Sequence, residues 1–249
     1  MSAAVPASPR AEVLVTLSAV EATSEEGAGL AVVHDVTWTI AAGEWWAVCG
    51  EAASGKSALL AAAAGLTSPT RGHVRLLGID PVAATEGERT ESRRRVGFVF
   101  EGGGRLFGQL SVSENVALAA AYHENLDADA ARARALALLA LAGLESLADA
   151  SPPRLPLSVQ RRVALLRALA APVRLLFLDD PLRGLSPRDV RWWLDFLRSL
   201  RARRAAAGDP LTLVTSGSDL EVFRGAADRS AWVEEGRFEA LPAPAAVPG

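Results

Sequence analysis

The chain has 249 residues, of which 50% are apolar and 22% charged. This composition indicates one folded domain with room for an embedded subdomain, and it argues against general disorder. A net charge of −3 argues against a strongly basic nucleic-acid binder. No uncharged stretch is long enough for a membrane span, and the N-terminus lacks the basic and apolar regions of a secretory signal. The single cysteine, Cys49, fits a reducing compartment.

The first half of the chain contains segments typical of strands, with one short helix. Residues 1–10 and 240–249 are rich in Pro, Ala and small residues, and we expect both to be loose tails. Content of β-branched residues and partial alternation predict strands at 12–20, 31–40, 72–80 and 96–100. The apolar run 45–49 predicts a buried strand, and a helix is expected to follow over 55–64.

The second half combines a helix-rich segment with further strands. Ala and Leu dominate from Ser111 to Leu147, which predicts a helical subdomain of two or three helices. After a proline-rich break at 151–156, helices are predicted at 158–171, 188–207 and about 219–227. Strands are predicted at 175–178 and 211–215, with a last strand pair near 231–239. Alternation of strands and helices favours a mainly parallel α/β sheet.

One motif points directly to phosphate binding. Gly50, Glu51, Ala52, Ala53, Ser54, Gly55, Lys56 and Ser57 match the pattern G-x-x-x-x-G-K-[ST]. In this pattern backbone N–H groups surround a phosphate chain, the lysine reaches the β- and γ-phosphates, and the Ser57 hydroxyl is a candidate Mg²⁺ ligand. Lys56 is the only lysine among 26 basic residues, which indicates a position that needs a compact ammonium.

Two acids follow an apolar strand further along the chain. Asp179 and Asp180 come directly after Leu175–Leu178. A carboxylate at the end of a strand beside a phosphate loop can hold Mg²⁺, which is the role expected for Asp179. Asp180 would then lie next to the γ-phosphate, where an acid polarises a water molecule. A solvated strand end with a capping Asp is the alternative.

The order of these features resembles the nucleotide-binding subunit of ATP-binding cassette (ABC) transporters over about residues 11–239. The similarity extends to RGHVRLLGID, VGFVFEGGGRLFGQLSVSENVAL, RRVALLRALA, LLFLDDPLRGLSP and DLEVFRGAADR. The stretch from Leu106 to Leu126 most resembles the ATPases of Mce-type lipid transporters. The resemblance implies a P-loop NTPase core with a mainly parallel sheet, an antiparallel β subdomain and a helical subdomain inserted at about 105–157.

The sequence departs from that family at several functional positions. Glu101 stands where the family has a Gln near the metal and the attacking water, although an incidental acid on a flexible loop is an equal alternative. Asp180 replaces a Glu base, and Ser218 replaces a switch His; these three residues are the candidate catalytic groups. No aromatic residue for adenine stacking occurs in 17–29.

The family signature L-S-G-G-Q is also altered. An ungapped alignment places Leu155–Val159 there, without either glycine and with Pro156 in the segment. A one-residue gap would instead align Leu157 and Ser158 with the start of the signature, still without glycines. Because proline has no N–H and leucine is bulky, close approach to a phosphate of the opposite subunit is expected to be lost.

The resemblance implies a cytoplasmic ATP-binding subunit that uses ATP and Mg²⁺ at the inner face of the cell membrane. It would work through a separate transmembrane permease, touching the helical subdomain at 105–150, and would pair with itself or with another cassette. Hydrolysis is expected to be weak. The alternative is a nucleotide-binding pseudo-ATPase that supports an intact cassette. A small-molecule kinase and a DNA-repair relative are disfavoured, and no nucleic-acid partner is expected.

Overall fold

The structure is a computed structural model that describes residues 12–23, 31–104 and 106–242. Its strands are β1 (Val13–Thr23), β2 (Ala31–Ala41), β3 (Trp45–Cys49), β4 (Arg71–Leu76), β5 (Val96–Val99), β6 (Leu175–Leu178), β7 (Thr212–Gly217), β8 (Arg229–Glu234) and β9 (Arg237–Leu241). Its α-helices are α1 (Lys56–Ala63), α2 (Glu86–Arg94), α3 (Val112–Glu124), α4 (Ala128–Leu141), α5 (Leu157–Leu169) and α6 (Pro187–Ala206).

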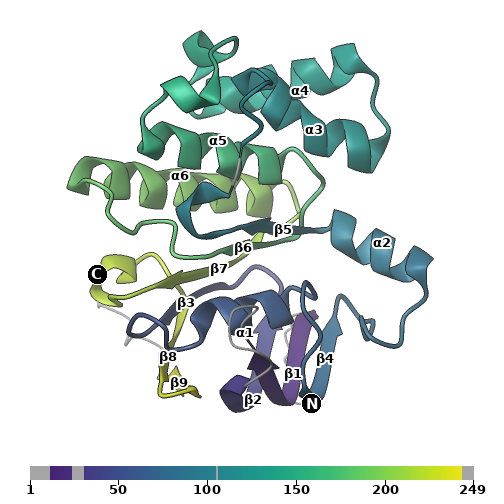
Figure 1. Ribbon diagram of the computed structural model, residues 1–249, viewed down its shortest axis with the longest axis vertical. Helices are drawn as coiled ribbons and strands as arrows, with labels where there is room; N and C mark the ends of the chain where they lie inside the picture. Colours follow the sequence, from purple (N-terminus) through teal and green to yellow (C-terminus); the bar gives the residue numbers. More distant parts are fainter. Residues whose placement is uncertain (1–11, 24–30, 105, 243–249) are drawn as a thin grey trace, which may run out of the picture.

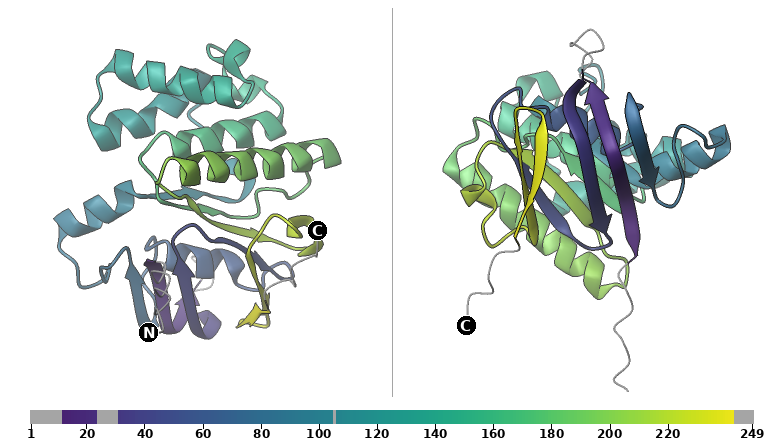
Figure 2. Two further views of the ribbon diagram at one scale, coloured as in Figure 1. Left: turned by 180° about the vertical axis from the view of Figure 1, so that it is seen from behind. Right: turned by 90° about the horizontal axis from the view of Figure 1, so that it is seen from below.

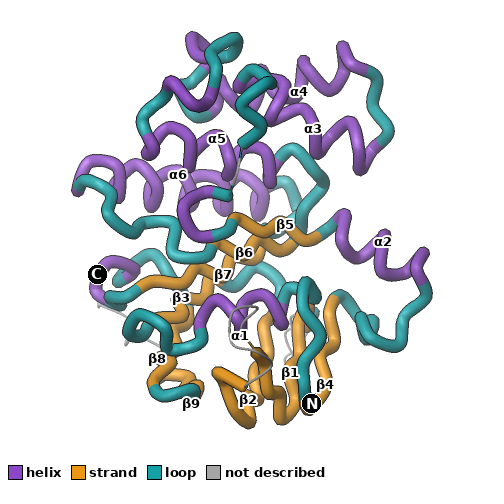
Figure 3. The backbone as a smooth tube through the Cα atoms, in the orientation of Figure 1, coloured by secondary structure: helices purple, strands orange, loops and turns teal. Residues whose placement is uncertain are grey.

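The strands form two sheets (Figures 1 and 3). The larger sheet has the order β5-β6-β7-β3-β8-β9, and all its neighbouring strands are parallel except β8 and β9. The smaller sheet, β2-β1-β4, is antiparallel throughout. The expected α/β fold with a mainly parallel sheet and an antiparallel β subdomain is therefore confirmed.

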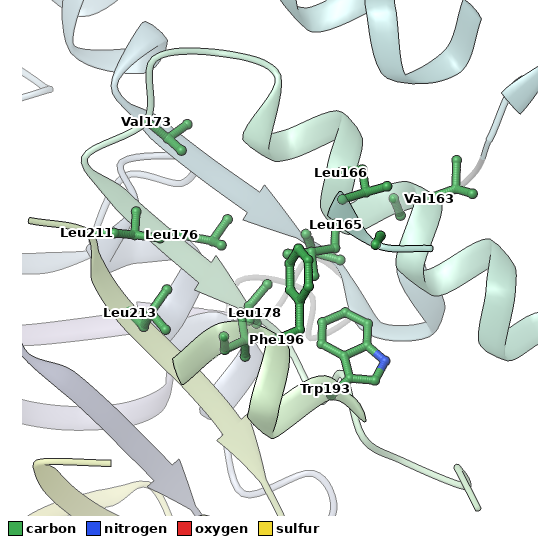
Figure 4. Close-up of a cluster of buried hydrophobic side chains, with 14 of the residues drawn as sticks. Val163, Leu165, Leu166, Val173, Leu176, Leu178, Trp193, Phe196, Leu211 and Leu213 are labelled. Atoms are coloured by element: carbon green, nitrogen blue, oxygen red, sulfur yellow. The ribbon is translucent and has the colours of Figure 1, made fainter. Parts of the chain in front are cut away.

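Two apolar cores hold these layers together. One lies between the large sheet and the small sheet and includes Leu59 and Leu60 of α1, so that α1 is packed between the sheets. The other covers the opposite face of the large sheet with side chains from α3, α5 and α6. Figure 4 shows its centre, where Trp193 and Phe196 of α6 meet Leu178 of β6. This double coverage explains why β3 and β6 are buried at every position.

The helices α3 and α4 form an outer layer beyond α5 and α6 (Figures 1 and 2). They lie between β5 and β6 in the chain, within the range 105–157 that the sequence assigns to a helical subdomain. Ser111 caps α3 by accepting from the Glu114 N–H, while the Glu114 side chain accepts from the Ser111 N–H. Asp127 caps α4 in the same position without the reciprocal bond.

The structure differs from the sequence predictions at three places. The helix α2 was not predicted, and a single 3₁₀ turn at Glu221–Phe223 stands where a helix was expected at 219–227. The last strand runs to Leu241, two residues into the segment expected to be a tail from 240. The other expected tail, 1–10, lies outside the described residues. In the part of the chain that is described, no helix is both long and apolar enough to cross a membrane.

Candidate functional site

The candidate site residues gather at one edge of the large sheet. Parallel pairing aligns Cys49 with Gly217, Leu178 with Thr215, and Val99 with Leu178. The segments that follow β3, β5, β6 and β7 therefore leave the sheet at the same carboxyl edge, which is where open α/β sheets bind ligands. The Gly50–Ser57 loop, Glu101, the Asp179–Asp180 pair and Ser218 all follow these strands.

The Gly50–Ser57 loop requires its two glycines for steric reasons. A Cβ at Gly50 would lie 2.0 Å from the carbonyl oxygen of Val233. Gly55 has φ +99°, and a Cβ there would lie 2.6 Å from Val33 Cγ1 and 2.7 Å from the Val32 oxygen. The close packing of this loop on β2 and β8 thus leaves no room for a side chain, as expected for a backbone wrapped around a small group.

Lys56 places its ammonium inside this loop. Its Nζ donates to the carbonyl oxygens of Gly50 at 2.8 Å and Glu51 at 2.5 Å, and it lies 3.3 Å from Ser54 Oγ. Burial lowers the pKa of the Lys56 ammonium, and the carboxylates of Asp180 and Asp179 oppose this shift. The N–H donors of the ammonium are therefore held at the centre of the loop, where a phosphate would compete with the carbonyls for them.

Asp179 lies against the same loop. Its carboxylate accepts hydrogen bonds from Ser216 Oγ, at 2.8 Å, and from the side chain of Ser57. Burial raises the pKa of Asp179, whereas the hydrogen bonds from the two serines counteract this. The sequence predicted that Asp179 and Ser57 would meet, but it gave no role to Ser216. The only available signal was a serine near the end of β7, where it is one of three hydroxyl residues.

Asp180 has an unusual backbone conformation, with φ +41°. Its N–H donates to Ser216 Oγ at 2.8 Å, so this one hydroxyl connects Asp180 with Asp179. Burial raises the pKa of Asp180; the charge of Glu101 adds to the shift, and Arg183 opposes it. Because a non-glycine residue at positive φ is strained, the Ser216 bond helps to hold this turn.

Glu101 follows β5 in the 3₁₀ turn Glu101–Gly103. Its carboxylate forms an ion pair with Arg183, which lies in the turn after Asp180. The negative charge of Glu101 raises the pKa of both Asp180 and Asp179, so these three carboxylates form one acidic cluster. The structure therefore brings Glu101 to the site but engages it with Arg183, a residue that the sequence analysis did not single out.

The remaining predicted positions are at the edge of this cluster. Ser218 is exposed directly after β7, and among the described residues its hydroxyl makes no hydrogen bond. Pro156 is the N-cap of α5 without a side-chain hydrogen bond, and Leu157 begins the helix with 55% of its surface exposed. The segment Leu155–Val159 thus presents a proline and a large apolar side chain to solvent.

Comparison with known proteins decides the family. The sequence profile of the ABC transporter family matches residues 33–183, more than half of the chain. The chain belongs to the ABC transporter family. The matched region contains the Gly50–Ser57 loop, Glu101, the two adjacent acids and Arg183, but it ends before Ser216 and Ser218.

Curated relatives of this ABC protein include methionine import ATP-binding proteins. The one from Rhizobium johnstonii, MetN, is 32% identical over 240 residues, covering 90% of this chain and 64% of the relative. MetN 1 of Burkholderia orbicola is 32% identical over 211 residues, covering 85% of this chain and 59% of the relative. The chain thus spans about three fifths of the length of these relatives. The similarity to Mce-type ATPases stays a prediction.

Solved structures agree with the fold. The ATP-binding cassette MJ0796, in a dimeric post-hydrolysis state bound to ADP and Pi, has a TM-score of 0.80 and 28% identity, covering 93% of this chain and all of that one. The cbiO1 protein of Clostridium perfringens, part of the cbiONQ transporter complex, has a TM-score of 0.76 at 22% identity, with 93% of this chain covered. The latter shows the fold alone. The predicted P-loop NTPase fold is confirmed.

Proposed function

We propose that this chain is the ATP-binding subunit of an ABC transporter, which binds MgATP, hydrolyses it slowly and acts through a separate membrane permease. The observation that carries the proposal is the Gly50–Ser57 loop, where two sterically required glycines surround the buried ammonium of Lys56. Family membership supports ATP as the ligand, because the relatives include methionine import ATP-binding proteins and the MJ0796 cassette was solved with bound ADP and Pi.

The loop and the helix that follows would bind the phosphate chain. The backbone N–H groups of Glu51, Ala52, Ala53 and Ser54 would surround the β-phosphate, and Lys56 would exchange its carbonyl partners for β- and γ-phosphate oxygens. The N-terminus of α1, which begins at Lys56, adds a favourable dipole. These contacts depend only on residues of this chain, so nucleotide binding should not require a partner.

The residues at the loop also fit Mg²⁺. The ion is usually held by one or two protein oxygen ligands together with phosphates and water. Ser57 and Asp179, already joined by a hydrogen bond, provide a hydroxyl and a carboxylate next to the loop. When bound, the ion would neutralise charge on the phosphates. The burial that raises the pKa of Asp179 would then be compensated by a cation.

Slow hydrolysis follows from the groups that would position water. Asp180 is one methylene shorter than the family Glu, and an error of about 1 Å at a reacting centre can cost on the order of a hundredfold in rate. Ser218 is exposed and has no imidazole. Glu101 is paired with Arg183. We therefore expect Asp180, Glu101 and Ser218 to occupy the catalytic positions with reduced effect.

The permease would contact a groove between the large sheet and the helical layer. The groove has a volume of about 510 Å³ and is lined by residues of β5, α3 and α5. Its rim exposes Phe100, Phe107, Leu118 and Tyr122, the last with 83% of its surface accessible. Such a concentration of exposed apolar side chains is typical of interaction surfaces. A cytoplasmic location at the membrane follows from this partnership. Pairing with a second copy or another cassette is supported by the dimeric state of the similar MJ0796 cassette.

Calorimetric titration of the purified chain with MgATP tests the proposal. For the wild type we expect a dissociation constant of roughly 1 µM to 1 mM. Lys56→Ala should lose binding, whereas Arg188→Ala, at an exposed residue of α6, should leave the dissociation constant unchanged. Absence of binding by the folded wild type would refute ATP binding. Turnover of about 1 s⁻¹ or more that Lys56→Ala abolishes would refute slow hydrolysis.

A further inference from the structure

The ion pair between Glu101 and Arg183 joins two loops at the carboxyl edge of the sheet. Glu101 follows β5, and Arg183 lies in the turn after β6. Their side chains are 48% and 59% exposed, respectively. Exposed ion pairs contribute little to the stability of a fold. Stability alone is therefore a poor explanation for an opposite-charge pair at this position.

Both loops are fixed to the same residue of α5. The buried Arg161 donates from Nη1 to the carbonyl oxygen of Arg183 at 2.5 Å. On the other loop, Gly103 packs so closely on α5 that a Cβ there would lie 3.0 Å from Arg161 Cα. The backbone of Arg183 is thus held by Arg161 of α5, whereas its guanidinium extends to the surface and pairs with Glu101.

The guanidinium lies at the same edge of the sheet as the candidate phosphate site. Arg183 lies in the turn that follows β6, where its N–H donates to the Asp180 carbonyl oxygen at 3.4 Å, and its guanidinium reaches Glu101 after the neighbouring strand β5. Three carboxylates, those of Asp179, Asp180 and Glu101, follow the paired strands β5 and β6 at this edge. A triphosphate entering this edge would meet their repulsion, and Lys56 together with one Mg²⁺ ion would balance only part of this negative charge.

We propose that Arg183 is a second phosphate-binding cation, which contacts the terminal phosphate of ATP held by the loop of the same chain while Glu101 keeps its side chain in place. The inference rests on the proposed function. Arginine presents five N–H donors in a planar fork. Since Glu101 accepts from Nη1, Nε and Nη2 remain to donate to phosphate oxygens. ADP lacks the terminal phosphate, so Arg183 would distinguish ATP from ADP.

This role would compensate for the altered positions of the chain. Ser218 cannot supply a positive charge, and the segment Leu155–Val159 lacks the glycines that would let N–H groups approach a phosphate. A guanidinium at Arg183 supplies charge and donors from within the same chain. Glu101 has a corresponding function, because its carboxylate orients the guanidinium and would release it in part to the more highly charged phosphate.

The test compares the affinities of the full chain for the Mg²⁺ complexes of ADP and of the non-hydrolysable β,γ-imido analogue of ATP. We expect Arg183→Ala to weaken binding of the ATP analogue about tenfold, the effect of one charge-assisted hydrogen bond, with ADP affinity unchanged within about twofold. Arg183→Lys should retain part of the preference. Arg188→Ala, in the first turn of α6, is the matched control and should change neither affinity.

The outcomes separate this inference from the proposed function. If the wild type binds neither nucleotide, the proposed function fails. If it binds both, and Arg183→Ala weakens both equally or neither, the role of Arg183 is wrong. Glu101→Gln loses the orienting carboxylate but also removes a negative charge, so it should weaken binding of the ATP analogue less than Arg183→Ala does. A loss as large as that in Arg183→Ala would show that the pair matters only as a structural unit, and would also overturn the inference.

Discussion

Ser216 gives the sharpest prediction about the site. Its side chain is fully buried, donates to Asp179 Oδ1 and accepts from the Asp180 N–H, both at 2.8 Å. Ser216→Ala removes both bonds without adding any atom that could clash. The buried carboxylate of Asp179 then keeps only Ser57 as a serine donor, and the N–H of Asp180 loses its partner at a strained backbone position.

The expected loss follows from these two bonds. A hydrogen bond to a charged group contributes about 1.5–3 kcal/mol, and a buried N–H left without a partner costs about 1–3 kcal/mol. Because the terms overlap and water can replace part of the loss, we expect Ser216→Ala to reduce the free energy of unfolding by about 2–4 kcal/mol. Since the acids also lose their mutual positioning, Mg²⁺-dependent ATP affinity should fall as well.

Urea denaturation followed by tryptophan fluorescence measures the loss of stability. Ser92→Ala is the matched control, because Ser92 is also a buried serine but its hydroxyl has no hydrogen-bond partner among the residues that the structure describes; its change should remain below about 0.5 kcal/mol. A loss in Ser216→Ala no larger than that of the control would refute the bridging role. In a double-mutant cycle with Asp179→Asn, the coupling should exceed about 0.5 kcal/mol.

Three further predictions concern the loop, the buried acid and the cysteine. Gly55→Ala should lose at least about 2 kcal/mol of unfolding free energy, because its Cβ would lie 2.6 Å from Val33 Cγ1; wild-type stability in urea would contradict the geometry. Burial raises the pKa of Asp179 above its ordinary value of 3.8, so the native state binds the carboxyl proton more tightly than the unfolded state. The free energy of unfolding therefore falls as the pH rises from 3.8 to the raised pKa. Asp179→Asn should therefore raise the urea midpoint of the nucleotide-free protein at pH 7, and a lowered midpoint would count against this sign. Burial raises the pKa of Cys49 to about 12, so a thiol reagent at pH 8 should label it only after unfolding; rapid labelling of the native chain would contradict this.

The sequence predicted most of the elements because their periodicity is local. The phosphate loop, the strand before it and the strand before Asp179 could be identified from short runs of residues. The helix α2 was missed because it is almost entirely polar and presents no apolar stripe. It nevertheless had a signal, since Thr85 and Glu88 form a capping box at its start.

The wrong helix at 219–227 has a tertiary cause. The segment contains polar and apolar residues at helical spacing, but Gly225 adopts φ +71° and ends any helix there. In addition, the ring of Phe223 packs against Gly217, where a Cβ would lie 2.9 Å from the ring. This contact favours one 3₁₀ turn over a regular helix, and it depends on β7, which no local pattern around Phe223 could reveal.

The site shows the same limit of local patterns. The motif indicated the phosphate loop and its acids. Ser216, within β7, instead contacts Asp179 and Asp180 after β6, and Arg183, after β6, contacts Glu101 after β5. Their importance depends on the parallel register that aligns the ends of β5, β6 and β7. A single sequence gives the types of these residues but not their separation.

The altered positions of this chain are not spread evenly over the site. The groups that would bind the phosphates of the chain's own nucleotide, Gly50–Ser57 and Asp179, keep the family pattern, whereas Glu101, Asp180, Ser218 and Leu155–Val159 depart from it. Those four are the groups expected to position water or to approach the nucleotide of a second cassette. Because small displacements cost far more in rate than in affinity, this distribution should separate binding from turnover, so that nucleotide occupancy rather than rapid hydrolysis would control the permease.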